Sequence, residues 1–228
     1  MTLSSGRVAV LCPSRSRPAQ FVNLAKSIMK TTNRADLIGY VDDDQSDLYE
    51  ATCARTRSEL RSRMSVHIGP RIGPVASANA LVKEFPGYDL YGLIPDDAVV
   101  TTGQWAEWCL DVAAFLPNRV GVVSPAHNQG PHVDMPFVTK EWIQATGWFA
   151  VPIAHHFVWP LVIALIGEMT AIVHAPKERF NIDHDLMMTA NQVWASRDTE
   201  AFLPFVAREL MPIVDRVRDA INAQVVPV

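Results

Sequence analysis

The sequence is poor in cysteine and lacks the patterns through which cysteine shapes small proteins. Cys12, Cys53 and Cys109 lie far apart, without the spacing of a zinc site or a disulfide framework. Isolated cysteines of this kind behave as small buried hydrophobic residues in a reducing compartment. The first residues, MTLSSGR, also lack the charged start and apolar core of a secretory signal. We therefore predict a cytoplasmic protein.

An excess of positive charge is also missing. The net charge is -4 over 228 residues, so no overall field attracts nucleic acid, and only local basic patches could do so. Hydrophobic residues make up 49% of the chain and charged residues 19%, which is ordinary for a globular protein with a full core. No internal repeat or low-complexity tract is visible. The composition therefore excludes a disordered or repetitive chain.

Long unbroken hydrophobic runs are absent too. Residues 142–167 contain no Asp, Glu, Lys or Arg, which is long enough to cross a bilayer. Pro152 and Pro160 interrupt this segment, and its unbroken apolar part, residues 157–166, is only about half a span. We predict a buried helix here and no transmembrane span.

Short apolar runs alternate with stretches of helical spacing along most of the chain. This alternation predicts an α/β fold, a single Rossmann-like domain with a mainly parallel sheet flanked by helices. The expected strands are residues 8–11, 37–41, 64–68, 90–94, 120–124 and 170–174. The clearest expected helices cover residues 21–29, 105–115, 138–146 and 199–223. The last of these is an amphipathic tail that we expect to pack on the domain or on a partner subunit of a homo-oligomer.

The segment YDLYGLIPDDA, residues 88–98, holds the most informative pattern. Its apolar strand candidate is stopped by Pro95, and Asp96 and Asp97 follow at once. Ligands of open α/β sheets bind outside the carboxyl ends of the strands. Two adjacent carboxylates repel each other unless a cation lies between them, and Mg2+ accepts one or two carboxylates together with phosphate oxygens. The alternative is a polar turn, because Pro-Asp-Asp is also favourable turn chemistry.

Three further segments carry polar groups at predicted strand or helix ends. CPSRSRP offers Arg15 and Arg17 beside a helix start, which suits a phosphate, a base or a structural loop equally. Residues 42–44 are three acids that either contact a ribose, base or metal or cap the next helix. In GPRIGPVASANAL, Ser77 and Asn79 lie early in a helix, from which they can reach a diphosphate.

An arginine run follows the second expected strand. Arg55, Arg57, Arg61 and Arg63 are most simply a solvated helix face, and the alternative is a patch for a phosphate-bearing acceptor.

Taken together, these segments resemble the GT-A class of nucleotide-sugar-dependent glycosyltransferases, most closely small family 2-like members of bacteria and their phages. The stretches that carry the resemblance are VAVLCPSRSRP, YVDDD, GPRIGPVASANAL, LYGLIPDD, GQW and PFVTKEWIQATGWF, within about residues 7 to 195. It implies a catalytic domain over residues 1–195 and a helical tail over residues 196–228. It also implies a nucleotide-sugar donor, UDP-sugar favoured, with Mn2+ or Mg2+, and a hydroxyl acceptor such as a modified DNA base, a glycan or a lipid.

The resemblance assigns roles to single residues. LYGLIPDD corresponds to the family's DxD-type motif, so Asp97 would bind the metal and Asp96 would face the sugar or ribose. A late histidine would complete the metal site, with His174 as first choice and His184 as second. The remaining nucleotide-binding residues would be Pro13, Ser14, Arg17, Asp43 with Asp42 or Asp44, and Asn79 near the diphosphate.

The sequence departs from the family where a general base is expected. Inverting members present an acid after the GWF segment, but here the region reads HHFVWPL, with Trp159 at about that place. His156 and Asp134 are the candidate catalytic residues, and Glu141 is a further alternative. A histidine with a pKa near 6.5 accepts a proton at neutral pH.

Two other function classes stay open. The missing acid fits a catalytically silent nucleotide-sugar-binding or assembly protein. A nucleotidyltransferase also combines an α/β sheet with Asp and Mg2+, although CPSRSRP lacks the glycines that such enzymes usually carry after their first strand.

Overall fold

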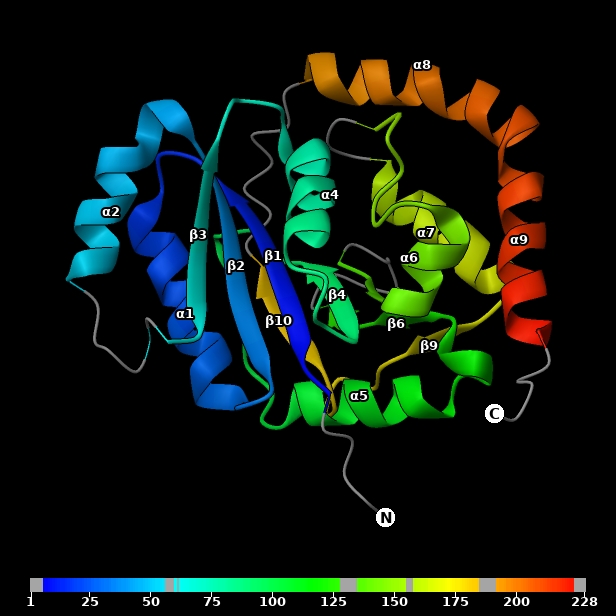
Figure 1. Ribbon diagram of the computed structural model, residues 1–228, viewed down its shortest axis with the longest axis horizontal. Helices are drawn as coiled ribbons and strands as arrows, with labels where there is room; N and C mark the ends of the chain where they lie inside the picture. Colours follow the sequence, from blue (N-terminus) through cyan, green and yellow to red (C-terminus); the bar gives the residue numbers. More distant parts are fainter. Residues whose placement is uncertain are drawn as a thin grey trace.

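A twisted sheet runs through the centre of the fold (Figure 1). The computed structural model describes residues 6–55, 60, 62–127, 135–154, 158–184 and 192–223, with the backbone alone for 184 and 192–196. Within these residues, seven strands form the large sheet in the order β3-β2-β1-β4-β8-β6-β9. They are β1 (Val8–Ser14), β2 (Ala35–Asp42), β3 (Met64–Gly69), β4 (Leu90–Leu93), β6 (Val122–Ser124), β8 (Phe137–Thr139) and β9 (Ile172–His174).

The strand directions confirm the predicted α/β class. β3, β2, β1 and β4 pair in parallel, as do β6 and β9. Only β8, among the described strands of this sheet, runs the other way, between β4 and β6. The carboxyl ends of β1, β2 and β4 therefore meet at one edge, where their following loops gather.

A small second sheet lies directly after the acidic pair. It contains β5 (Ala98–Val100), β7 (Ala126–His127) and β10 (Asn181–His184). β10 pairs antiparallel with β5, and this register sets the backbone of His184 opposite Ala98. Residues from the last third of the chain thus lie beside the turn that carries Asp96 and Asp97.

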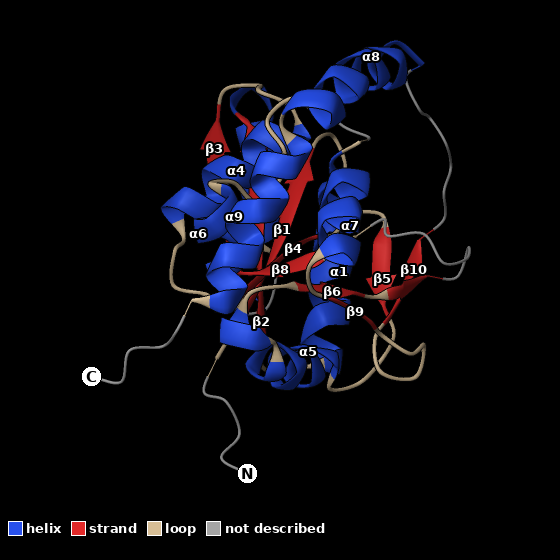
Figure 2. Cartoon of the chain, turned by 90° about the vertical axis from the view of Figure 1, so that its right-hand side faces the viewer, coloured by secondary structure: helices blue, strands red, loops and turns tan. Residues whose placement is uncertain are grey.

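Helices cover both faces of the large sheet because alternate strand residues are apolar on both sides. Val8, Val10 and Cys12 face one core, and Ala9 and Leu11 face the other. The helices that flank the sheet are α1 (Pro18–Thr31), α2 (Ser46–Ala54), α4 (Pro74–Glu84), α5 (Trp105–Phe115), α6 (Lys140–Thr146), α7 (Trp159–Met169), α8 (Gln192–Arg208) and α9 (Leu210–Asn222), with short 3-10 turns η1 (Asp43–Gln45) and η2 (Pro117–Arg119). α1 and α5 belong to the first core, and α4, α6, α7 and α9 to the second. Figure 2 shows α4, α6 and α9 on one side of the sheet and α1, β5 and β10 on the other.

Two predicted helices are corrected by the structure. The segment 138–146 does not begin as a helix: residues 137–139 are β8, and Thr139 then caps α6 by accepting a hydrogen bond from the backbone N–H of Trp142. The tail is two helices that break at Glu209, where α8 gives way to α9. α9 packs on α6 and α7 through Ile213, Val214 and Val217. Residue 196, the expected start of the tail, lies inside α8. Among the described residues, no helix combines the length and apolar character that a membrane crossing requires.

Candidate functional site

Asp96 and Asp97 form the middle of a turn at the carboxyl end of β4. The backbone N–H of Ile94 is held by the carbonyl of Leu11 at 3.0 Å, and the turn closes when Ala98 N donates to Pro95 O at 3.1 Å. The Asp96 side chain is fully buried, whereas that of Asp97 is 26% exposed. The two carboxylates therefore lie at the boundary between the core and the surface.

A chain of hydrogen bonds holds the buried carboxylate. The Ser14 hydroxyl donates to Asp96 Oδ2 at 2.5 Å, and the Tyr49 hydroxyl lies 2.5 Å from Ser14 Oγ. With the Ser14 proton committed to Asp96, Tyr49 is the donor of that second bond. Burial raises the pKa of Asp96 above its usual value near 3.8, while Ser14 and Arg17 partly offset this rise.

Arg17 bridges the two acids. Its Nη2 lies 2.9 Å from Asp96 Oδ1, and its Nη1 donates to Asp97 Oδ2 at 2.7 Å. The approach to Asp96 Oδ1 lacks hydrogen-bond geometry, so this buried oxygen has no hydrogen-bond partner. One guanidinium thus faces two negative charges.

An open cavity of about 580 Å3 lies beside this pair, at the carboxyl edge of the sheet. It is lined by the ends of β1 and β2, the loops after β1 and β3, and the start of α4: Pro13, Ser14, Arg15, Arg17, Tyr40, Asp42, Arg71, Ile72, Gly73, Pro74 and Ser77. Gly73 has φ +84°, a left-handed conformation that suits glycine, and it turns the chain into α4. Three guanidiniums and a helix N-terminus make the cavity suitable for an anion.

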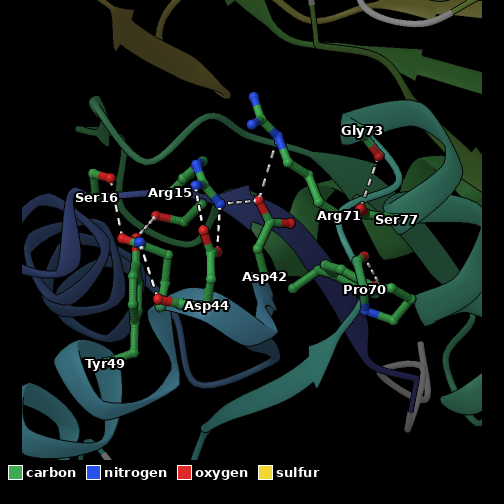
Figure 3. Close-up of polar contacts among 12 residues, drawn as sticks. Arg15, Ser16, Asp42, Asp44, Tyr49, Pro70, Arg71, Gly73 and Ser77 are labelled. Atoms are coloured by element: carbon green, nitrogen blue, oxygen red, sulfur yellow. Dashed lines mark hydrogen bonds and ion pairs between the residues drawn. The ribbon is translucent and has the colours of Figure 1, made fainter.

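Charged pairs order one wall of the cavity (Figure 3). Arg15 donates to Asp42 Oδ2 at 2.6 Å and to both oxygens of Asp44, at 2.6 and 2.5 Å. The hydrogen bond from Arg15 lowers the pKa of Asp44. Arg71 approaches Asp42 at 4.0 Å and is 73% exposed, which leaves its guanidinium close to solvent. Tyr40 donates to Pro70 O at 2.9 Å and fixes the loop that carries Arg71.

The structure brings together five of the nucleotide-binding residues predicted from the sequence. Pro13, Ser14, Arg17 and Asp42 line the cavity, and Asp96 adjoins it through Ser14 and Arg17. Asp43 lies exposed in η1, outside that lining.

Asn79 lies elsewhere. Its Oδ1 accepts from Phe149 N and Ala150 N at 3.0 and 3.1 Å, and its Nδ2 donates to Ala150 O at 2.7 Å. These bonds tie α4 to residues 149 and 150, beside a separate, mostly apolar cavity of about 390 Å3.

The two metal-site histidines named from the sequence occupy different places. His174 ends β9, three strands from β4, and its Nε2 lies 2.8 Å from Glu168 Oε1. Strands are spaced by about 4.8 Å, so this position is on the order of 14 Å from β4. The backbone of His184, in contrast, faces Ala98, the neighbour of Asp97. Among the described side chains, no group of three His, Cys, Asp or Glu residues is placed to hold a metal.

The structure says less about the residues predicted to act as general base. His156 and Asp134 lie outside the described residues. Glu141 does not fit the role, because it stands 3.7 Å from Arg119, which binds Asp89 before β4, at the opposite edge of the sheet from Asp96. Trp159 is 4% exposed at the start of α7 and packs near the Phe149 ring, with centroids 5.7 Å apart.

Tyr49 and Arg71 contribute to the site but were not predicted from the sequence. Tyr49 reads as an ordinary helix residue, and only the fold shows it against Ser14. Arg71 carried a usable signal, because an arginine between two Gly-Pro steps lies on a stiff loop at a strand end.

These features define a GT-A fold: an α/β sheet with an acidic turn after a central strand and an anion-suited cavity at its carboxyl edge. Comparison with solved structures confirms that fold. The chain is similar to the Pyrobaculum calidifontis mannosyltransferase PcManGT in complex with GDP-Man and Mn2+ (TM-score 0.65, 13% identity, 95% of this chain and 70% of that chain). It is also similar to residues 1–349 of S. aureus TarS (TM-score 0.57, 11% identity, 94% and 70%). A third similar structure is the Mycobacterium tuberculosis glucosyl-3-phosphoglycerate synthase with Mn2+, UDP and glucosyl-3-phosphoglycerate (TM-score 0.60, 11% identity, 90% and 80%). Neither a protein-family model nor a curated protein sequence matches the chain.

Proposed function

We propose that this protein is a metal-dependent glycosyltransferase that moves a sugar from a nucleoside diphosphate sugar to a hydroxyl acceptor. The observation that carries the proposal is the Asp96–Asp97 turn beside the cavity at the carboxyl edge of a GT-A sheet. The similar structures support it, because PcManGT is in complex with GDP-Man and Mn2+ and the mycobacterial synthase with UDP and Mn2+.

The cavity suits the anionic part of such a donor. Arg15, Arg17 and Arg71 contribute positive charge, and the start of α4, at Gly73, Pro74 and Ser77, forms part of its wall. A helix N-terminus and arginine forks are the groups that proteins use to bind phosphate. Asp42 adds an acceptor for a base N–H or a ribose hydroxyl. We favour UDP over other nucleotides, as the sequence resemblance implies.

The acidic pair fits a divalent cation. Asp97 is partly exposed, and Asp96 Oδ1 is a buried oxygen with no hydrogen bond, so the pair places two carboxylates beside the cavity, both in contact with Arg17. Mg2+ and Mn2+ sites of this kind are completed by phosphate oxygens and water. His184 joins them in the proposal because of its register beside Ala98, ahead of His174, the first choice from sequence. When bound, the cation would neutralise charge on the departing diphosphate.

The reaction is a displacement at the anomeric carbon. The acceptor oxygen forms a bond to that carbon while the bond to the diphosphate oxygen breaks, and the nucleoside diphosphate leaves. The arginines of the cavity hold the diphosphate and stabilise its growing charge. The acceptor proton goes to a general base, for which we retain His156 and Asp134. Trp159, buried where an acid is expected, supports the alternative of a protein that binds the donor without transfer.

The acceptor is proposed only as a class. A modified DNA base, a glycan or a lipid hydroxyl all satisfy the chemistry. The arginine run was the feature that could attract a phosphate-bearing acceptor. Within it, Arg63 has a structural role, because its guanidinium donates hydrogen bonds to the backbone carbonyls of Thr32 and Ala35. We place the reaction in the cytoplasm, and a homo-oligomer is part of the proposal.

Two measurements test the proposed function. Calorimetry with UDP and Mn2+ should show binding that Asp97→Ala abolishes and that Glu50→Ala, an exposed acid on α2, leaves unchanged. Incubation with a panel of nucleotide sugars should release free nucleoside diphosphate slowly. Binding without release would support the silent protein, and unchanged UDP affinity in Asp97→Ala would refute the assigned metal site.

A further inference from the structure

The Arg17 guanidinium lies against both acids of the proposed metal site. It contacts Asp96 at 2.9 Å and Asp97 at 2.7 Å, so it already supplies positive charge there. The match is incomplete, because Asp96 Oδ1 is buried without a hydrogen bond although Arg17 Nη2 lies 2.9 Å away. A divalent cation would balance this pair better than a guanidinium does.

The Arg17 backbone is anchored while its side chain is half exposed. Arg17 N donates to the Tyr49 hydroxyl at 3.2 Å, and Arg17 O accepts from Phe21 N at 3.1 Å. The side chain is 45% exposed and lines the same cavity as Arg15 and Arg71. Rotation about its side-chain bonds can therefore withdraw the guanidinium from the acids and keep it within the cavity, without moving the backbone.

We propose that Arg17 is an internal competitor of the metal, one that holds Asp96 and Asp97 until a nucleoside diphosphate draws its guanidinium away. The proposal rests on the proposed function and adds an order to it. A cation arriving alone must displace Arg17, whereas a cation arriving with the diphosphate meets acids that the diphosphate has freed by binding the guanidinium. Metal and nucleotide thus strengthen each other's binding.

The test measures Mn2+ alone, without nucleotide, through the electron paramagnetic resonance signal of free Mn2+ at pH 7.5. Arg17→Gln should bind Mn2+ roughly three- to tenfold more tightly than the wild type, because its metal site has no internal occupant. The matched control is Arg208→Gln, which removes the same charge from an exposed position on α8, outside the cavity lining. Its Mn2+ affinity should equal that of the wild type.

A second variant keeps the proposal testable if Arg17→Gln fails to fold. Arg17→Lys keeps the charge, but an ammonium lacks the fork that spans two carboxylates, so its Mn2+ affinity should lie between those of the wild type and Arg17→Gln. Adding UDP should raise Mn2+ affinity more in the wild type than in Arg17→Gln.

The outcomes separate this inference from the proposed function. Equal or weaker Mn2+ binding by both Arg17 variants, with the wild type still binding Mn2+ and UDP, would overturn the competition and leave the transferase proposal intact. No Mn2+ binding by the wild type, with or without UDP, would overturn both.

Discussion

Ser14 and Asp96 are 82 residues apart in the sequence, and the hydroxyl of the first donates to the carboxylate of the second at 2.5 Å. The bond joins the end of β1 to the turn after β4, two neighbouring parallel strands. It orients a carboxylate that would otherwise lie in the core with Arg17 as its main partner. The first loop of the cavity and the acidic turn are therefore one structural unit.

Replacing Ser14 should weaken this unit. Ser14→Ala removes a buried hydrogen bond to a charged group and the acceptor of the Tyr49 hydroxyl, so the free energy of unfolding should fall by about 1–3 kcal/mol. Urea denaturation measures the change. The control is Ser16→Ala, whose hydroxyl donates to Gln45 at the surface and should change stability by less than about 0.5 kcal/mol. Equal midpoints for both variants would contradict the expectation.

The buried charge of Asp96 makes a pH-dependent prediction. Because burial raises the folded pKa of Asp96 above 3.8, the folded state gains stability as the pH falls through that pKa, and the gain is absent at neutral pH. Asp96→Asn mimics the neutral form and leaves half-exposed Arg17 in contact with Asp97. At pH 7 the variant should therefore unfold at a higher urea concentration than the wild type, and its advantage should shrink toward pH 4. A wild type more stable than the variant at pH 7 would mean that the Arg17 pair outweighs the cost of burial.

Asn79 distinguishes a structural role from a ligand-binding role. Asn79→Ala removes three hydrogen bonds to the buried backbone of Phe149 and Ala150, which should cost on the order of 3 kcal/mol of stability. UDP affinity of the folded variant should change less than twofold, because Asn79 lies outside the cavity lining. Asn23→Ala, on the exposed face of α1, is the control. Weak UDP binding by a stable Asn79→Ala would instead support the diphosphate contact predicted from the sequence.

Gly92 tests the packing between β4 and β8. A Cβ at this position would overlap the Phe137 ring, which is fully buried opposite it. Gly92→Ala should destabilise the protein by about 1–3 kcal/mol. Gly87→Ala adds a methyl group where no atom lies within 4 Å and should be nearly neutral. Adding Phe137→Leu to Gly92→Ala should recover part of the loss, and additivity of the two changes would argue against the overlap.

The sequence was informative wherever local patterns decide structure. The apolar runs at residues 8–11, 37–41, 64–68 and 90–94 are confirmed as β1, β2, β3 and β4. β1, β2 and β4 are mostly buried, whereas β3 lies at the edge of the sheet, with Ser65 and Ile68 exposed. The GT-A resemblance is likewise confirmed at the level of the fold.

The short strands β5, β7, β8 and β10 were not predicted, since each has two to four residues and exists only through pairing with a distant segment. Thr139 shows the limit well. Thr139 both ends β8 and caps α6. Because helical spacing begins directly after it, the sequence pattern predicted helix for the strand residues as well.

Side-chain partners in the site were harder to foresee than the site's location. The loop with Arg17 and the acidic turn were both recognised as polar strand ends, but sequence patterns give no distance between residues 80 positions apart. Asn79 illustrates the same limit: its helix position was correct, and its direction was decided by Phe149 and Ala150, far along the chain.

The pairing of β10 with β5 has a consequence for biosynthesis. When the ribosome has released the chain only as far as Met169, Asp96 and Asp97 are present but the strand that borders their turn has not yet emerged. The strand beside the acidic turn is thus added after most strands of the large sheet have emerged. During synthesis, β1, β2, β3 and β4 can therefore pair with one another before β10 reaches β5.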